Sequence, residues 1–132
     1  MGKGSSPRPF SVTKDEFDNK WDAIFKKDKQ MKSYQYLENE VEIWGYARGI
    51  TVNGKPLGQA KKTIEEAEEL LQAVHKNNRE EIMDAVGDIV VTLIMQCALQ
   101  GFTLTECLEK AYNEIKDRKG YLNEQGIFVK EQ

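Results

Sequence analysis

The sequence has few of the side chains that serve as catalytic nucleophiles or soft-metal ligands. Its 132 residues include only two cysteines and one histidine. Cys97 and Cys107 stand in apolar helical patterns, where cysteines are usually reduced core thiols, so we expect no disulfide framework. His75 has no second histidine and no convincing Ser or Cys partner, which leaves a nucleophilic triad with little support.

Leader, membrane and phosphate-loop signals are also missing. No glycine-rich phosphate loop occurs, because the glycines near helical patterns fit helix ends and turns instead. The longest apolar run, residues 89–99, is shorter than a membrane span, and residues 1–9 lack the apolar segment of a leader. We therefore expect a cytoplasmic protein with no membrane partner.

A basic excess is missing from most of the chain. The net charge is −3; residues 1–35 carry eight Lys and Arg against five Asp and Glu, and the remainder carries eleven against seventeen. An acidic body lacks the basic stripe of a duplex-DNA reader. A polyanionic substrate would need a metal ion to offset this acidity.

What the chain does have is a helical pattern with acidic side chains beside it, predicted over residues 59–75. Apolar residues recur there at the three- and four-residue spacing of a one-sided helix. At about 100° per residue, Glu65, Glu66 and Glu69 share one flank of that stripe, whereas Glu68 faces solvent. The predicted inward stripe is Ile64, Ala67, Leu70, Leu71 and Val74.

A second acidic pair leads into the most apolar helix of the chain. Asp84 and Asp88 stand four residues apart, on one line of a helix that is apolar around its whole circumference from Ile89 onwards. We therefore expect this helix to be buried on nearly every side. A carboxylate at the start of so apolar a helix costs several kcal/mol, roughly, unless a positive charge compensates it.

Two antiparallel helices would bring Glu66, Glu69, Asp84 and Asp88 around one small volume. Carboxylate oxygens without nearby Cys or His side chains favour a hard divalent cation, and we predict Mg²⁺. The alternative is a solvated acidic face, because glutamates are common in exposed helical surfaces. Asp88 favours the metal interpretation, since a solvated face does not explain an aspartate that opens an apolar helix.

The remaining pattern predicts an all-α bundle of four main helices with an extra N-terminal helix. Residues 1–35 form the N-terminal part, with a capping pattern at residues 13–16 and a short docking helix after it; residues 36–132 form the helical catalytic domain.

A helix is expected over residues 34–47 with Leu37, Val41 and Trp44 buried. The connection over residues 49–58 carries no helical period. The last helix is expected to turn Leu104, Leu108, Ala111 and Ile115 inward and to end at Gly120, followed by an extended tail at residues 127–129.

The combination of motifs resembles the MazG-like nucleoside triphosphate pyrophosphohydrolases, whose pattern is EExxE on one helix and ExxD on the next. Glu65-Glu66-x-x-Glu69 matches the first half and Asp88 the end of the second. The likeness covers roughly residues 36–129. One position departs from the pattern: Ala85 stands where the family has the Glu of ExxD, and Asp84 precedes it. Asp84 is then the candidate for the fourth ligand.

The resemblance implies hydrolysis of a (deoxy)nucleoside triphosphate to the monophosphate and pyrophosphate, with Mg²⁺ as cofactor and Mn²⁺ as a substitute. It also implies self-association as a dimer or a dimer of dimers, which agrees with an apolar helix too large for one small chain to cover. Glu65 is either a group behind the metal ligands or the base that accepts the proton of water. The residues assigned in this way are Glu65, Glu66, Glu69 and Asp88 for catalysis, Glu66, Glu69, Asp84 and Asp88 for the metal, and Lys62, Trp44, Asn113, Lys116 and Arg118 for the substrate.

Two alternatives stay open. Relatives of this kind include hydrolases directed at dUTP or dCTP and phosphoribosyl-ATP pyrophosphohydrolases, and the choice depends on the pocket for the base. The chain could also be a non-catalytic helical interaction module that retains the acidic cluster. Ala85 is the feature that favours this last alternative.

Overall fold

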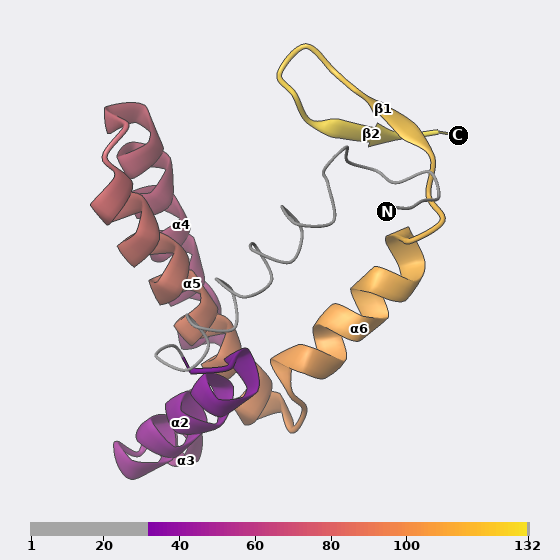
Figure 1. Ribbon diagram of the computed structural model, residues 1–132. Helices are drawn as coiled ribbons and strands as arrows, with labels where there is room; N and C mark the ends of the chain where they lie inside the picture. Colours follow the sequence, from indigo (N-terminus) through magenta and orange to yellow (C-terminus); the bar gives the residue numbers. More distant parts are fainter. Residues whose placement is uncertain (1–31, 132) are drawn as a thin grey trace, which may run out of the picture. The chain divides into compact units, whose positions relative to one another are not determined.

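The computed structural model describes residues 32–131, and the chain divides into two compact units, Met1–Glu40 and Val41–Gln132. The described part is mostly helical, as predicted for an all-α protein. Its elements are α2 (Tyr34–Ala47), α3 (Ile50–Asn53), α4 (Pro56–Lys76), α5 (Arg79–Gln100), α6 (Leu104–Ile115), β1 (Gly120–Leu122) and β2 (Phe128–Lys130) (Figure 1). The helix predicted after residues 13–16 lies outside the described residues.

The main packing is between α4 and α5, which form an antiparallel helical hairpin (Figure 1). Asn77 ends α4 in the left-handed region at φ 54°, a conformation that asparagine tolerates better than most residues. Asn78 begins α5, because its side chain accepts a hydrogen bond from the backbone N–H of Glu81. Further along, the side chain of Gln96 donates to the carbonyl of Pro56 at 2.9 Å. These contacts hold the two long helices side by side.

The face that α4 turns to α5 is not the apolar stripe predicted from the sequence. The contacting side is polar or small, with Glu66 and Ala73 buried and Thr63 half-buried. Ile64 and Leu71 from the predicted stripe are instead 61% and 59% exposed. The periodicity correctly identified an apolar side of the helix, but no other described helix covers that side.

The helix α5 is buried only over its C-terminal half, so the prediction of burial on nearly every side is wrong for the other half. Ile94, Met95 and Cys97 are buried, whereas Ala85 is the one buried residue between Arg79 and Asp88. By length and composition alone α5 could span a membrane, because the 22-residue helix extends beyond the apolar run of residues 89–99. The core helix of a soluble protein meets the same criterion.

The connection between α2 and α4 is more helical than the sequence suggested. Gly49, at φ 78°, lets the chain reverse and begin α3, which contacts α5. Pro56 occupies the first turn of α4, where its missing N–H costs nothing, so this helix starts three residues earlier than predicted. Within α2, the residues predicted to be buried are not: Leu37 and Trp44 are exposed, while Glu38 and Gly45 are buried.

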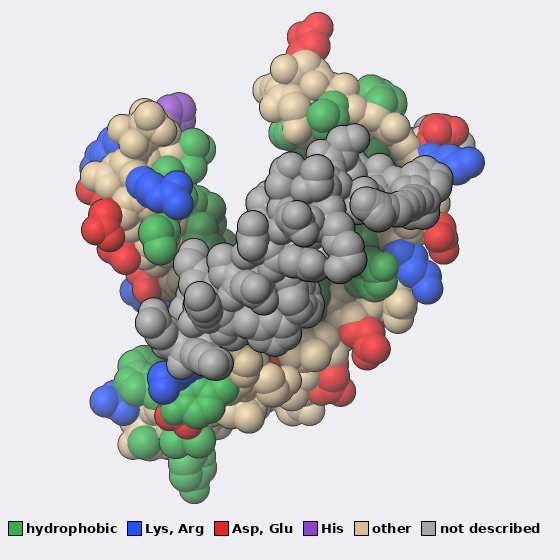
Figure 2. Space-filling model, viewed as in Figure 1, with side chains coloured by type: hydrophobic (Ala, Val, Ile, Leu, Met, Phe, Trp, Pro, Cys, Tyr) green, Lys and Arg blue, Asp and Glu red, His purple; other side chains and the backbone are tan. Residues whose placement is uncertain are grey.

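The helix α6 starts as predicted and ends early. Thr103 forms a capping box with Glu106, but the helix stops at Ile115 and does not continue to Gly120. Leu108 and Ile115 were both predicted to face inward, but both are exposed. Figure 2 shows that other hydrophobic side chains also lie at the surface. Within residues 32–131, α6 contacts α5 alone, so a closed four-helix bundle is not seen in this part of the chain.

The chain ends in an antiparallel hairpin of β1 and β2, in which Tyr121 pairs with Val129. Asn123 closes the turn, because its Oδ1 accepts hydrogen bonds from the backbone N–H groups of Gln125 and Ile127, and Gly126 supplies a positive φ of 77°. The extended segment predicted at residues 127–129 is confirmed. The two strands contact none of the described helices, so this segment does not fold over them.

Candidate active site

An acidic pocket of about 460 Å³ lies between the C-terminal half of α4 and the N-terminal half of α5. It brings together three of the four predicted metal ligands, Glu69 from α4 and Asp84 and Asp88 from α5. Asp84 and Asp88 are four residues apart and therefore lie on one line of their helix. The lining residues are Glu69, Gln72, Lys76, Glu81, Asp84, Ala85 and Asp88.

Ala85 lines this pocket although only 4% of its surface is exposed. The position where the MazG-like pattern has a glutamate is thus directed at the α4–α5 interface, and the short side chain leaves room beside it. Asp84, the neighbouring carboxylate, also lines the pocket but is exposed. A carboxylate at position 84 is therefore more exposed to solvent than one at position 85 would be.

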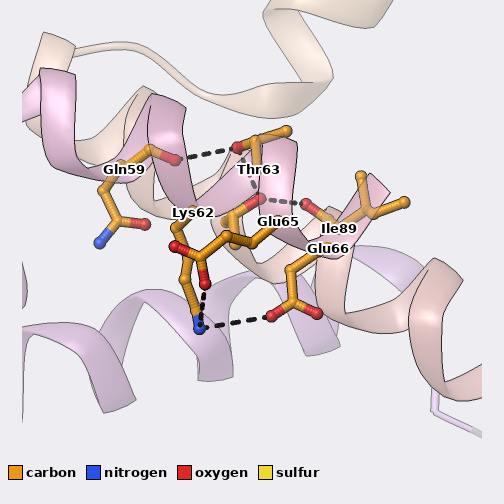
Figure 3. A network of polar contacts seen from close by, with 7 residues as sticks. Gln59, Lys62, Thr63, Glu65, Glu66 and Ile89 are labelled. Carbon is orange, nitrogen blue, oxygen red and sulfur yellow. Dashed lines mark hydrogen bonds and ion pairs between the residues drawn. The ribbon is translucent and has the colours of Figure 1, made fainter. Parts of the chain in front are cut away.

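Glu66 is the most buried carboxylate of the acidic motif, although it is not among the lining residues of the pocket. Its surface is 7% exposed. One oxygen, Oε1, lies 3.5 Å from Lys62 Nζ, and the other, Oε2, is buried without any hydrogen-bond partner (Figure 3). A buried, unpaired carboxylate oxygen is costly, on the order of 1–3 kcal/mol or more. Such an atom is a candidate ligand for a cation.

Lys62 lies between two glutamates of the same helix. Its ammonium is 3.7 Å from Glu65 and 3.5 Å from Glu66 (Figure 3). The negative charge of Glu65, followed by the hydrogen bond and charge of Glu66, raises the pKa of Lys62 above its usual value. Lys62 was predicted to bind the substrate, and in this structure its ammonium pairs with two glutamates of the acidic motif.

A pair of threonine hydroxyls lies between α4 and α5, one turn from Glu66. Thr63 Oγ1 and Thr92 Oγ1 are 2.8 Å apart, and each also lies within hydrogen-bond distance of a carbonyl of its own helix, that of Gln59 or Ile89 (Figure 3). Two hydroxyl protons cannot serve three hydrogen bonds at once. One of the three contacts is therefore always without a proton. The two hydroxyl groups can rotate and change which of them donates, while the heavy atoms stay in place.

Sequence reasoning missed Lys76, Gln72 and Glu81 as members of the pocket. Among residues 32–131, Lys76 is the only basic residue that lines it, and its ammonium lies 3.5 Å from Glu81. The signal was available in the spacing, because Lys76 is seven residues after Glu69 and so lies on the same side of the helix. The side chains of both partners of this ion pair are at least half solvent-accessible, so its contribution to stability is small.

The donor set of the pocket fits a hard divalent cation, although the side chains do not yet enclose one. Among residues 32–131, no three His, Cys, Asp or Glu side chains converge closely enough to hold a metal ion as they stand. Carboxylate oxygens are nevertheless the ligands that Mg²⁺ prefers, and Glu66 has a buried oxygen without a partner. Rotation of the exposed Glu69, Asp84 and Asp88 side chains would be needed to complete the site.

The predicted substrate residues outside α4 and α5 do not line the pocket. Asn113 is on α6, Lys116 caps the end of that helix and Arg118 follows it, so the prediction that Lys116 and Arg118 lie within the helix is wrong. The guanidinium of Arg48 lies over the ring of Trp44, 5.0 Å from its centroid. Trp44 therefore already has a cation on one face of its ring.

These features define a class: a helical protein with a carboxylate-lined pocket in an antiparallel pair of helices. Residues 48–114 match the phosphoribosyl-ATP pyrophosphohydrolase family, and this is just over half of the chain. The chain therefore belongs to that family, which is part of the MazG-like all-α nucleoside triphosphate pyrophosphatase superfamily. The matched segment includes α4, α5 and the whole acidic pocket. Comparison with curated proteins and with solved structures returned no match.

Proposed function

We propose that this protein hydrolyses a nucleotide with a triphosphate chain at the bond between the α- and β-phosphates, and releases pyrophosphate. The observation that supports this most directly is the acidic pocket itself, in which Glu69, Asp84 and Asp88 line one volume beside the buried Glu66. Membership of a pyrophosphohydrolase family supports the same reaction class.

Mg²⁺ is the cofactor we propose, with Mn²⁺ as a substitute. Glu66, Glu69, Asp84 and Asp88 would hold it, and the ion would supply positive charge against the phosphate oxygens and make a water molecule more acidic. Without such a charge, an acidic pocket would repel a polyphosphate, because like charges at contact distance are unfavourable.

The remaining residues have roles that follow from their charge and position. Glu65 is exposed on the flank of α4 and is a candidate base for the proton of the attacking water. Lys62 lies next to Glu66, so the arrival of a cation at Glu66 would release the ammonium towards phosphate. Lys76 is a second cation at the same pocket.

Two substrate classes are consistent with this chemistry. The MazG-like motif suggests a (deoxy)nucleoside triphosphate, with dUTP- or dCTP-directed hydrolysis as narrower versions. The family match supports phosphoribosyl-ATP, which also carries a triphosphate chain. The carboxylate pocket recognises the part that both classes share, and the base and sugar would be selected elsewhere.

A non-catalytic role is the contrasting proposal. It is supported by Ala85, because the fourth carboxylate of the motif is missing from the most buried position of the pocket. In this case the acidic cluster would remain as a structural feature of an interaction module.

One experiment distinguishes these proposals. The protein is incubated with Mg²⁺ and, separately, each common NTP and dNTP and phosphoribosyl-ATP, and pyrophosphate is measured. Release from one substrate class identifies it, and Asp88→Asn is expected to abolish that release whereas Glu68→Gln, on the solvent side of α4, keeps it. Absence of pyrophosphate from every substrate with Mg²⁺ and with Mn²⁺ would support the interaction module.

We further propose that the protein is cytoplasmic and self-associates as a dimer or tetramer. The exposed apolar stripe of α4 supports association, since Ile64, Leu71 and Val74 are each more than half exposed in the single chain.

A further inference from the structure

Two cysteine thiols lie next to each other at the junction of α5 and α6, away from the acidic pocket. Cys97 Sγ and Cys107 Sγ are 3.7 Å apart, and neither cysteine takes part in a disulfide in this structure. The sulfur atoms of a disulfide are about 2.05 Å apart, so a further approach of roughly 1.7 Å would join them. We propose that Cys97 and Cys107 form a reversible disulfide by exchange with a small-molecule disulfide.

The chain between the two cysteines holds them in this arrangement. Gly101 ends α5 in the left-handed region, and the N–H groups of Gly101 and Phe102 both donate to the carbonyl of Cys97. Thr103 then caps α6, and its carbonyl accepts a hydrogen bond from the N–H of Cys107. Each cysteine is therefore bonded through its backbone to the short connection between the helices, so the proximity of the thiols is a property of the turn itself.

The two thiols differ in their access to solvent, and this sets the order of reaction. Cys97 is 5% exposed, whereas Cys107 is half-buried. Cys107 is therefore the thiol that a dissolved reagent meets first, and Cys97 is the one that resolves the intermediate.

The chemistry is two successive thiol–disulfide exchanges. The Cys107 thiolate attacks one sulfur of oxidised glutathione, a bond forms between them, and the glutathione S–S bond breaks. One glutathione leaves as a thiolate and takes up the proton that Cys107 released. The Cys97 thiolate then attacks Cys107 Sγ, the mixed disulfide breaks, and a second glutathione thiol leaves. The two protein sulfurs are oxidised and the glutathione disulfide is reduced, so two protein thiols and one disulfide give one protein disulfide and two thiols.

The bond would connect α5 covalently to α6. A cross-link restricts the unfolded chain, so the oxidised protein is expected to melt at a higher temperature than the reduced protein. The effect is reversed by an excess of dithiothreitol, because the bond is formed by exchange and not by irreversible oxidation.

The sequence makes this proposal simple to test by mass spectrometry. Lys and Arg are absent between Arg79 and Lys110, so trypsin leaves both cysteines on one peptide, residues 80–110. The folded full-length protein is equilibrated with mixtures of oxidised and reduced glutathione, treated with N-ethylmaleimide and digested. The expected product is a single peptide, lighter than the dithiol form by two hydrogen atoms and without label.

Matched variants test the order of reaction. Cys97→Ser is expected to accumulate glutathione on Cys107, because the resolving thiol is missing, whereas Cys107→Ser is expected to leave the buried Cys97 unmodified. Two fully labelled thiols in strongly oxidising glutathione would overturn the proposal. So would two peptides joined across chains, or a wild-type protein that keeps glutathione on Cys107 as the Cys97→Ser variant does. The wild-type measurement decides the matter even if a variant fails to fold.

Discussion

Glu66 combines two properties that rarely occur together, burial and an oxygen without a hydrogen-bond partner. In a structural role such a carboxylate is a defect, since an apolar side chain of the same length would pack there without the cost. As a metal ligand it is useful, because the ion supplies the missing partner. Function and stability therefore make opposite predictions for its replacement.

Glu66→Met is expected to stabilise the protein in metal-free buffer by about 1–3 kcal/mol, because it removes a buried unpaired oxygen and keeps the side-chain length. The same change should abolish any increase in stability on addition of Mg²⁺. Urea unfolding with and without Mg²⁺ measures both effects, and Glu68→Met serves as the control on the solvent side. A Glu66→Met protein that is less stable without metal would show that Glu66 is satisfied by its pairing with Lys62.

The fourth ligand of the proposed Mg²⁺ site depends on two neighbouring residues of α5. Asp84 and Ala85 both line the pocket, but only Ala85 is buried. If Asp84 has replaced the missing glutamate, Asp84→Asn should reduce turnover about as much as Asp88→Asn, by several kcal/mol, roughly, of transition-state stabilisation. Ala85→Glu should then be neutral or harmful. A nearly unchanged Asp84→Asn enzyme, together with tighter Mg²⁺ binding by Ala85→Glu, would show that Asp84 is not a ligand.

At the scale of elements, the packing of Gly45, near the end of α2, against Met95 of α5 depends on the absence of a side chain. A Cβ atom on Gly45 would overlap the end of the Met95 side chain, at 2.6 Å from its Cε and closer still to its Sδ, and Met95 is 1% exposed. The overlap in Gly45→Ala is expected to lower the free energy of unfolding by about 1–3 kcal/mol. Alanine is also more stable than glycine in a helix by roughly 0.5–1 kcal/mol, and this gain offsets part of the loss.

Gly58 in the first turn of α4 is the matched control, because a Cβ there would meet nothing within 4 Å. Gly58→Ala should leave stability unchanged or raise it by up to about 1 kcal/mol. Thermal unfolding of the two variants gives the comparison. Equal stability of the two variants would mean that the Met95 side chain can move away from a new Cβ at no cost, which would contradict the expectation from its burial.

The ends of the elements were more predictable from the sequence than the faces they bury. Thr103 and Asn78 cap α6 and α5, and such caps can be read from the sequence because each is a local interaction over three residues. The stripe of Ile64 and Leu71 was recognised as apolar and predicted to face inward, but both side chains are exposed. A hydrophobic period shows that one side of a helix needs cover, and it does not show whether the same chain provides it.

The same limit applies to the candidate site. Glu69, Asp84 and Asp88 were predicted to meet because helical spacing is regular, and they line one pocket. The exposure of Asp84 and the depth of Ala85 depend on how α4 and α5 rotate about their axes, which no single-helix pattern specifies. Lys76 was missed because the helix was predicted to end at residue 75, whereas α4 continues to Lys76.

At the scale of the whole molecule, a cation that binds only the folded chain must raise its stability. Mg²⁺ at a hundredfold excess over its Kd is expected to add about 2.7 kcal/mol to the free energy of unfolding. Differential scanning fluorimetry across a Mg²⁺ titration measures the shift in Tm. Glu69→Gln and Asp88→Asn should each remove it, whereas an undiminished shift in both variants would place the cation elsewhere.

The exposed stripe of α4 gives the last prediction, which concerns assembly. Ile64 and Leu71 are 61% and 59% exposed, so a charge there would be solvated in a single chain and buried without a partner in a dimer that uses this face. Ile94 is 3% exposed within the chain, so a charge at that position would be buried in either state. The two sites therefore separate assembly from folding.

Leu71→Lys is expected to weaken self-association at least tenfold while the isolated chain stays folded, because every 1.4 kcal/mol, roughly, of interface energy is a factor of ten in Kd. Ile94→Lys is expected to prevent folding, with loss of the helical circular dichroism signal. Sedimentation equilibrium over a range of concentrations distinguishes the outcomes. A wild-type chain that is monomeric at micromolar concentration would show that the stripe is not an interface between copies. A Leu71→Lys protein that associates like the wild type would move the interface to another face, for which the exposed Leu108 and Ile115 of α6 are the next candidates.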